Sequence, residues 1–439
     1  MTNPKERIYD VAVLGAGTAG TAASIFASQK GLSTVQLGKP SEMSFASGCL
    51  DLFSILPAEP PSFFSNPWEG IESLLKQNPA HPFSKVSKKE IEAGFGAFAK
   101  FMEACGIRYH KKNDANRFII TPAGTLKSTW YVPSSMAAGA SALKRKKKIL
   151  IAGIKGLKGF GAEQMASTLN RFHPNIRAVT VQFPGREHTG DLMCERLAWD
   201  LETPGMPEKF AAVLSRSADN AEAVGLPAIL GVHRFAELKD RLEAIIKKPV
   251  FEIPTLAPSV TGLRMKEAFL AGASEAGIAT RSQLVKKIDM DTGGNFVFTI
   301  TQGLVEERIT AEHLVLATGR FMGRGLCIRD GRISEALFDL PVTQPGNRSL
   351  WYERDFFDPQ GHAVNRAGVE TDPVFRPLDA NGDVFHPRLF AAGGILAHQD
   401  WKREKSGSGI SISSAFKAVS SMPCGTAGSK REEFGIHKA

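Results

Sequence analysis

The sequence predicts an α/β protein of two domains, and three observations lead to this fold class. The chain has 439 residues, which is more than one hydrophobic core usually serves. Hydrophobic residues make up 43% of it and charged residues 23%, an ordinary globular composition. Residues 11–37 read as strand, helix and strand in turn. The chain therefore has the material for a sizeable core built on βαβ units.

The elements follow one another in a regular way along the chain. Residues 11–14 form a short apolar run that ends in glycines, residues 21–30 are rich in alanine and predict a helix, and residues 34–37 predict the next strand. Beyond this unit the pattern predicts, in order, helix 89–106, strand 148–154, helix 161–172, strands 179–183 and 228–232, helix 263–276, strands 296–301, 314–317 and 388–392, and a serine-rich helix that ends at residue 419.

A glycine-rich turn follows the first strand and opens the first helix. It matches the GxGxxG fingerprint of dinucleotide-binding domains in the position that the fingerprint requires. The first glycine permits a tight turn, the second lets the backbone approach a pyrophosphate, and the third lets the helix pack closely on the strand. The free N–H groups at the start of the helix favour a phosphate. We therefore expect a dinucleotide on Gly15, Ala16, Gly17, Thr18, Ala19 and Gly20.

The acidic residue that usually binds the ribose, about 20 residues further on, is absent. Gly38 and Lys39 stand at the end of the second strand, and Glu42 comes later and out of register. Two alternatives follow from this. Either Lys39 donates to the ribose or to a phosphate, or the cofactor lacks the adenosine half.

Two later segments resemble signatures of flavoproteins of the glutathione-reductase superfamily. The sequence LVLATGR at residues 314–320 resembles the second signature, and LFAAGG at residues 389–394 resembles the third, although a glycine replaces its usual Asp. The three motifs in this order imply a Rossmann-like, glutathione-reductase-like fold that binds a flavin rather than NAD. The further cofactor-binding candidates that this resemblance implies are Ser47, Gly48, Thr318, Gly319, Gly393 and Gly394.

Other segments resemble the B subunit of anaerobic glycerol-3-phosphate dehydrogenase, over nearly the whole chain. The resemblance implies a flavoprotein that holds FAD, or the FMN usually described for that family. It also implies an FAD-bearing partner subunit, an iron–sulfur partner subunit, oxidation of glycerol 3-phosphate to dihydroxyacetone phosphate, and electron transfer toward menaquinone. The segments that carry it are SGCLDL at 47–52, TPAGTLKSTW at 121–130, PTLAPSVTGLR at 254–264, DFF at 355–357 and GVETD at 368–372.

One stretch departs from that family. Where the family has a run with glycine and cysteine after the third signature, residues 398–409 read HQDWKREKSGSG. This loop is expected to touch the flavin or a partner. This departure keeps a second function open, a stand-alone FAD-dependent oxidoreductase that acts on another small anionic substrate. The sequence shows no clear catalytic acid–base pair, which keeps a third function open, a non-catalytic flavin electron conduit.

Four side chains are candidates for the chemistry itself. Lys127, Arg264 and Arg376 are candidates to hold an anionic substrate, because a phosphate or carboxylate takes charge-assisted donors. His398 lies just past the third signature and is a candidate proton donor or acceptor, because imidazole titrates near neutrality. Ser47 and Gly48 form the loop that is expected to contact the flavin, which we call the flavin loop. Cys49 adjoins it without a second cysteine nearby, so we expect Cys49 to be inert.

The resemblance to flavoproteins also predicts a discontinuous flavin domain with a cap or substrate domain inserted into it. The predicted boundaries are 1–55, 255–345 and 380–422 for the flavin domain, 56–254 for the inserted domain with a contribution from 346–379, and 423–439 for a tail.

Charge and cysteine content limit the partners. The formal net charge of +9 favours anionic substrates, an acidic subunit or an anionic membrane surface. The densest basic run, residues 144–148, predicts a solvated strand entrance, with a docking patch as the alternative. It lacks interleaved aromatic residues, so nucleic acid is not expected.

The five cysteines are scattered and form no CxxC motif, so no protein-bound metal is expected. Residues 1–10 do not resemble a secretory signal, and no apolar stretch of about 18 residues occurs. The sequence therefore predicts a cytoplasmic protein with at most peripheral association at the inner face of the membrane through a partner subunit.

Overall fold

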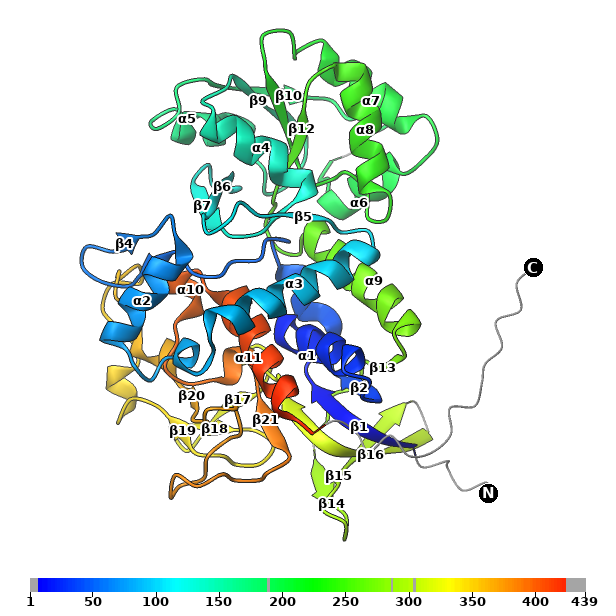
Figure 1. Cartoon of the computed structure of the whole chain (residues 1–439). Coiled ribbons are helices and arrows are strands. Elements are labelled where there is room, and N and C mark those ends of the chain that lie inside the picture. The colour runs from blue at the N-terminus through cyan, green and yellow to red at the C-terminus, as the bar shows by residue number, and fades with distance from the viewer. Residues whose placement is uncertain (1–6, 188–189, 286, 303–304, 424–439) are drawn as a thin grey trace.

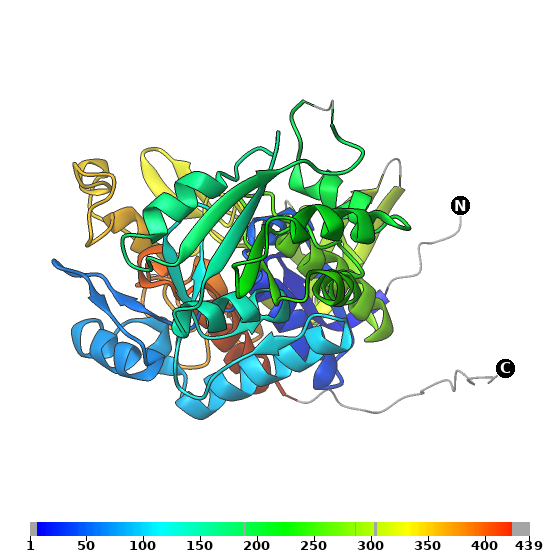
Figure 2. The same cartoon turned by 90° about the horizontal axis from the view of Figure 1, so that it is seen from above.

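Two sheets form the frame of the protein. The computed structural model describes residues 7–187, 190–285, 287–302 and 305–423. In Figure 1 a four-stranded sheet with its helices lies at the top, and a seven-stranded sheet lies below it. The predicted α/β class is therefore confirmed. Seen from above, in Figure 2, the upper unit lies over the lower one.

The larger sheet contains the first predicted βαβ unit at its centre. Strand β1 pairs in parallel with β2 on one side and with β16 on the other, and β21 pairs in parallel with the end of β16. Strands β15 and β14 continue the sheet antiparallel. The strands are β13 (Ile278–Arg281), β2 (Thr34–Leu37), β1 (Arg7–Leu14), β16 (Val305–Leu316), β15 (Phe296–Gln302), β14 (Ile288–Met290) and β21 (Leu389–Ala391).

The register places the ends of four strands at one edge of this sheet. Leu14 lies opposite Leu37 in β2 and opposite Leu316 in β16, and Leu316 lies opposite Ala391 in β21. Because these strands are parallel, the loops that follow them emerge side by side, where α/β proteins usually bind their ligands. The three sequence motifs all lie in these loops.

Helices cover one face of the larger sheet. These are α1 (Thr18–Gln29), α3 (Lys88–Ala104), α9 (Val260–Glu275) and α11 (Gly407–Ser421). Helix α1 packs on α11, where the rings of Phe26 and Phe416 meet edge to face at 5.3 Å. Helix α3 packs on α11 as well, although it belongs to the stretch 56–254 that the sequence assigns to the inserted domain. The predicted boundaries stay predictions.

The smaller sheet is entirely parallel, in the order β10, β9, β11, β12. Helices connect its strands, as parallel pairing requires. Its strands are β10 (Ile176–Val181), β9 (Ile149–Ile154), β11 (Ala223–Pro227) and β12 (Val250–Ile253). Its helices are α4 (Ser134–Lys144), α5 (Ala162–Leu169), α6 (Cys194–Leu201), α7 (Met206–Ser215) and α8 (Phe235–Ile246).

The predicted strand at 228–232 is wrong. The strand is β11, which ends at Pro227, and the next residues form a buried loop. Ala228, Ile229 and Leu230 are all fully buried, so their apolar run resembles a buried strand in sequence. The N–H of Leu230 donates to a side chain, Glu252, over 2.8 Å instead of to a sheet.

Short elements complete the fold. They are β3 (Ile55–Leu56) paired with β4 (Ser62–Phe63), β5 (Tyr109–His110) with β8 (Val132–Pro133), β6 (Arg117–Ile120) with β7 (Leu126–Thr129), β17 (Leu326–Arg329) with β18 (Arg332–Glu335), β19 (Val342–Thr343) with β20 (Gly368–Val369), and the helices α2 (Pro67–Gln77), α10 (Trp401–Glu404), η1 (Pro40–Phe45), η2 (Pro82–Lys85), η3 (Arg348–Leu350), η4 (Ala363–Arg366) and η5 (Gly393–Ile395).

The described helices include none that is long and apolar enough to cross a membrane. Within the same residues, no group of three or more His, Cys, Asp or Glu side chains is placed to hold a metal ion.

Candidate functional site

The fingerprint glycines form a turn with no room for side chains. Gly15 has φ +124°, and a Cβ on it would lie 2.1 Å from the carbonyl oxygen of Ala317 at the end of β16. A Cβ on Gly20 would lie 1.9 Å from the carbonyl oxygen of Gly15. Helix α1 begins directly after Gly17, and no side chain caps it. Its first N–H groups and the positive end of its dipole are therefore available to a phosphate.

The other two motifs meet this turn. A Cβ on Gly393 would lie 2.5 Å from the Cβ of Ala19, and a Cβ on Gly394 would lie 3.7 Å from the Cα of Gly319. The hydroxyl oxygen of Thr318 is buried and has no hydrogen-bond partner among the described residues. Three segments that are far apart in sequence thus form one cradle of bare backbone. This cradle fits a dinucleotide, whose pyrophosphate needs a close approach to the backbone.

The loop after β2 contains Gly38 and Lys39, where the sequence predicts contact with the ribose or a phosphate. Gly38 has φ +147°, and a Cβ on it would lie 3.2 Å from the backbone nitrogen of Ala16. Lys39 follows it as an exposed side chain, and it makes no hydrogen bond or ion pair within the described part of the chain. Its ammonium group is therefore free. That it binds a ribose or a phosphate stays a prediction.

The structure brings Ser47 and Lys127 together, although 80 residues separate them. The ammonium of Lys127 donates to the hydroxyl of Ser47 over 2.9 Å and forms an ion pair with Asp51 over 2.9 Å. Burial alone would lower the pKa of Lys127, but the charge of Asp51 raises it above its ordinary value. Lys127 is therefore positively charged at neutral pH, at the loop that the sequence assigns to the flavin.

The same loop packs against the start of α11. The N–H of Gly409 donates to the carbonyl of Asp51 over 2.7 Å, and no side chain caps the helix. Lys405, which the sequence reasoning missed, lies just before this helix in a left-handed conformation. Its pKa is lowered by burial and by the charge of Lys127. A second cation and a helix N-terminus thus lie beside the flavin loop.

Cys49 directly follows Gly48 as a buried thiol. Burial raises its pKa to about 11, so almost none of it is thiolate at neutral pH. This supports the prediction that Cys49 is inert.

The guanidinium groups of Arg264 and Arg376 are both paired with carboxylates of the protein. Arg264 is buried and makes two hydrogen bonds to Glu252, of 2.5 and 2.7 Å. It lines a cavity of about 20 Å³ together with Gly48. Arg376 pairs with Asp372 over 2.7 Å, four residues away. These contacts favour structural roles for both arginines over the substrate binding that the sequence predicts.

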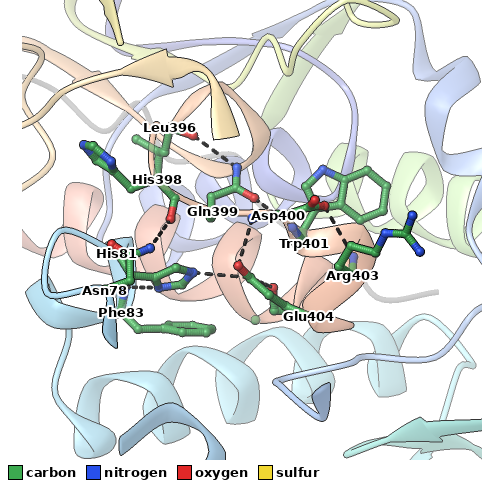
Figure 3. Close-up of polar contacts among 12 residues, drawn as sticks. Asn78, His81, Phe83, Leu396, His398, Gln399, Asp400, Trp401, Arg403 and Glu404 are labelled. Carbon is green, nitrogen blue, oxygen red and sulfur yellow. Dashed lines mark hydrogen bonds and ion pairs between the residues drawn. The ribbon is translucent and has the colours of Figure 1, made fainter. Parts of the chain in front are cut away.

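His398 pairs with a carboxylate on the neighbouring segment. Its Nε2 hydrogen-bonds to Glu370, whose carboxylate also accepts from the hydroxyl of Thr343 over 2.7 Å. The hydrogen bond to His398 is the main reason why the pKa of Glu370 falls to about 2. The backbone of His398 is fixed as well, because Asn78 donates to its carbonyl over 2.8 Å (Figure 3).

The low pKa of Glu370 predicts an acid-sensitive contribution to stability. A carboxyl with a folded-state pKa of about 2 and an unfolded value of about 4.3 stabilises the protein above pH 4.3, and this is lost as the pH falls toward 2. We expect Glu370→Gln to lower the free energy of unfolding at pH 6 by about 1 kcal/mol or less, because the pair is partly exposed. Urea unfolding at pH 6 and pH 3 should show the difference shrinking at pH 3. An equal difference in the free energy of unfolding at pH 6 and at pH 3 would contradict this prediction.

A buried network supports the loop after the third signature (Figure 3). His81 and Glu404 pair over 3.3 Å, and Glu404 also accepts from the hydroxyl of Ser406 over 2.7 Å and from the N–H of Asp400 over 2.8 Å. Burial alone would raise the pKa of Glu404, but the charge of His81 and these hydrogen bonds lower it. The changed stretch 398–409 thus contains α10 and the first residues of α11, and this network supports it.

Arg320 is a further residue that the sequence reasoning did not single out. It ends the second signature, and its guanidinium donates to the carbonyl of Gln399 over 2.8 Å and to the carbonyl of Asn365. Burial lowers its pKa to about 10, and Asp400 and Glu404 offset part of this effect. In sequence Arg320 is only a basic residue after a strand. Its carbonyl partners lie 45 and 79 residues away and could not be predicted from it.

Comparison with known proteins agrees with this cradle. A family model described as "FAD binding domain" matches residues 10–410. The B subunit of anaerobic glycerol-3-phosphate dehydrogenase from Vibrio cholerae serotype O1 (strain M66-2) is 30% identical over 439 residues, which cover 97% of this chain and 99% of the relative. A protein of Halobacterium salinarum (strain ATCC 29341 / DSM 671 / R1), named as a probable B subunit of the same enzyme, is 30% identical over 424 residues, or 93% of this chain and 96% of the relative.

Among solved structures, 3-ketosteroid delta1-dehydrogenase from Sterolibacterium denitrificans superposes with a TM-score of 0.40 and 11% identity over 94% of this chain and 99% of that one. The family match over most of the chain confirms the predicted flavin fold, with FAD as the cofactor, and makes the protein a flavin-dependent oxidoreductase. The chain therefore belongs to the family of FAD-binding-domain proteins and, within it, to the family of anaerobic glycerol-3-phosphate dehydrogenase B subunits.

Proposed function

We propose that this chain is the B-type flavoprotein subunit of a complex that oxidises glycerol 3-phosphate to dihydroxyacetone phosphate. In this proposal it works beside an FAD-bearing subunit and passes electrons through an iron–sulfur subunit toward menaquinone, at the inner face of the cell membrane. The names of relatives that match over 97% and 93% of the chain support it. The observation that carries it is the charged Lys127 at the flavin loop, in hydrogen-bond contact with Ser47.

The cradle supplies the position of the cofactor. When bound, FAD accepts two electrons from the CH–OH group of a substrate. The chain's part is to bind the pyrophosphate at the start of α1, to present unhindered backbone beside it, and to keep the site dry with the buried strands around it. The residues proposed to hold the cofactor are Gly15, Ala16, Gly17, Thr18, Ala19, Gly20, Lys39, Ser47, Gly48, Thr318, Gly319, Gly393 and Gly394.

Lys127 and Lys405 are proposed to receive the phosphate of the substrate. Lys127 uses two of its three N–H donors, on Ser47 and Asp51, so one donor is left for an oxygen of the phosphate. Lys405 makes no ion pair within the described residues, and the two ammonium groups raise each other's energy until an anion joins them. A dianionic phosphate relieves this repulsion. A neutral alcohol does not, so the site favours phosphorylated or carboxylated substrates.

His398 is proposed to take the proton that leaves the hydroxyl group of the substrate. Its Nε2 is held by Glu370, and its Nδ1 has no hydrogen-bond partner among the described residues. The carboxylate of Glu370 holds the ring in place, as a carboxylate does for the histidine of a catalytic triad.

Substitution of Lys127 tests this function. We expect Lys127→Met to raise the KM for glycerol 3-phosphate roughly 10- to 100-fold, because a hydrogen bond to a charged group contributes about 1.5–3 kcal/mol. Its FAD content should stay unchanged. The measurement is turnover of the isolated, FAD-loaded chain with an artificial electron acceptor, and Lys127→Arg should recover part of the affinity.

Lys88→Met is the matched control, because Lys88 is a half-exposed lysine that pairs with Asp114 on the surface. Its KM should equal that of the unchanged chain. An unchanged KM in Lys127→Met would contradict the proposed phosphate site. A chain that holds FAD but turns over no glycerol 3-phosphate would favour the electron conduit, and turnover of a different small acid would favour the stand-alone oxidoreductase.

A further inference from the structure

One segment of the surface carries an unusual number of exposed apolar side chains. Residues 346–357 include η3, and all of them except Trp351 are exposed. Four large side chains, which we call the aromatic patch, are 56%, 62%, 75% and 75% exposed: Leu350, Tyr352, Phe356 and Phe357. Soluble proteins rarely leave such a group of apolar side chains in water without a partner.

The aromatic patch is held in a fixed conformation. Trp351 is 2% exposed and anchors the middle of the segment in the core. The Nδ1 of His362 accepts from the N–H of Glu353 over 3.1 Å, and its Nε2 lies 3.2 Å from the carbonyl oxygen of Phe356. The rings of Phe356 and Phe357 meet edge to face at 5.1 Å. A surface that is already ordered loses little entropy when a partner binds.

The aromatic patch is joined to the loop after the third signature. Arg403 donates to the carbonyl of Phe356 over 3.0 Å, and Asn365 donates to Asp400 over 3.2 Å. In the same loop Trp401 is 39% exposed, and a Cβ on Gly407, the first residue of α11, would lie 3.2 Å from its ring. The exposed surface thus continues from the aromatic patch to the start of the helix that meets the flavin loop.

The charges around the aromatic patch indicate what kind of partner fits. Basic residues outnumber acidic ones, so the matching surface carries acidic residues at its edge. Two of the acidic residues lie between the aromatic side chains, where an anionic bilayer would repel them and a protein surface can pair them. The basic residues are Arg348, Arg354, Arg366, Lys402 and Arg403, and the acidic ones are Glu353, Asp355 and Asp358.

We infer that the aromatic patch is the docking surface for an electron-accepting protein subunit, whose own surface has an apolar centre and an acidic edge. The inference rests on the proposed function in one respect, namely that electrons leave this chain for another subunit. The names of the relatives, which are all subunits of a larger enzyme, support a protein occupant. Aromatic and arginine side chains of this kind carry most of the binding energy in protein interfaces.

A double variant tests the docking surface. The chain is purified with FAD and titrated with the other subunits of the complex, which are expressed from the same organism. We expect Phe356→Ser with Phe357→Ser to raise the Kd for those subunits at least 30-fold. The control is Phe172→Ser, which removes a ring that is 77% exposed between α5 and β10. It should leave the Kd unchanged, and all variants should keep their FAD and their turnover with an artificial acceptor.

Hydrogen exchange gives a second measurement on the unchanged chain. Residues 346–357 should exchange more slowly in the complex than in the isolated chain. An unchanged Kd in the double variant, or unchanged exchange in this segment, would overturn the inference. So would binding of the isolated chain to phosphatidylglycerol vesicles that the double variant loses, because lipid would then be the occupant. Absence of FAD or of turnover in the isolated chain would count against the proposed function and not against the docking surface.

Discussion

A Gly15→Ala variant is expected to lose its FAD, with a fall in affinity of roughly a hundredfold or more. Gly15 has φ +124°, a conformation that costs a residue with a side chain about 1–3 kcal/mol. The added Cβ would also lie 2.1 Å from the carbonyl oxygen of Ala317. The backbones of Gly15 and Ala317 cannot move apart unless β1 separates from β16 or the turn into α1 opens. Each tenfold loss of affinity corresponds to about 1.4 kcal/mol, so strain and displacement together reach this size.

The measurement is the absorbance of bound flavin per purified chain, followed by chromatography of the flavin that heat releases. Gly31→Ala is the matched control, because Gly31 also has a positive φ, +82°, but a Cβ on it would meet nothing within 4 Å. This control should lose about 1–2 kcal/mol of stability and keep its FAD. Full FAD occupancy in Gly15→Ala would show that the fingerprint does not hold the cofactor. Release of FMN from the unchanged chain would contradict FAD.

Much of the flavin site could be predicted from local sequence, because its parts are local. The strand, the GxGxxG turn and the helix of residues 11–30 form one short unit whose glycines have a steric reason at each position. Gly319 and Gly393 follow apolar strands in the same way. What the sequence could not show is how close these segments lie, because strand order depends on the whole sheet. The resemblance to known flavoproteins supplied that information.

Pairings between distant polar side chains could not be predicted from the sequence. Lys127 stood out only as a basic residue in a recognisable segment, and its partners Ser47 and Asp51 come from a different part of the fold. Arg264 was selected in the same way, yet its partner is a buried carboxylate. A single charged residue has the same appearance in sequence whether it faces a ligand or a buried counter-ion, so only the packing separates the two roles.

Substitution of Arg264 is expected to produce the largest loss of stability. Its side chain is 5% exposed and that of Glu252 is 0% exposed, and the two are joined by two hydrogen bonds. Arg264 also donates to the carbonyl of Gly231 over 2.7 Å, so it ties α9 to β12 and to the loop after β11. Arg264→Met leaves the carboxylate of Glu252 buried without its counter-charge. Breaking a buried pair in this way costs about 3–5 kcal/mol.

Urea unfolding measures this loss of stability. Two further variants show whether the buried ion pair is its cause. Arg234→Met removes an arginine whose pair with Glu237 is about half exposed, and it should cost much less stability than Arg264→Met, because solvent screens an exposed pair. Glu252→Gln combined with Arg264→Met removes both charges and keeps an oxygen that can accept from the N–H of Leu230. This double variant should recover part of the loss.

A substrate-binding role for Arg264 predicts the opposite pattern. Arg264→Met would then raise the KM for glycerol 3-phosphate and leave the free energy of unfolding nearly unchanged. The cavity beside Arg264 has a volume of only about 20 Å³, which is room for about one water molecule and not for a phosphate. All three groups of its guanidinium already donate to protein oxygens. We therefore expect stability to change and the KM to stay constant, because the fold uses this charge to tie α9 to β12.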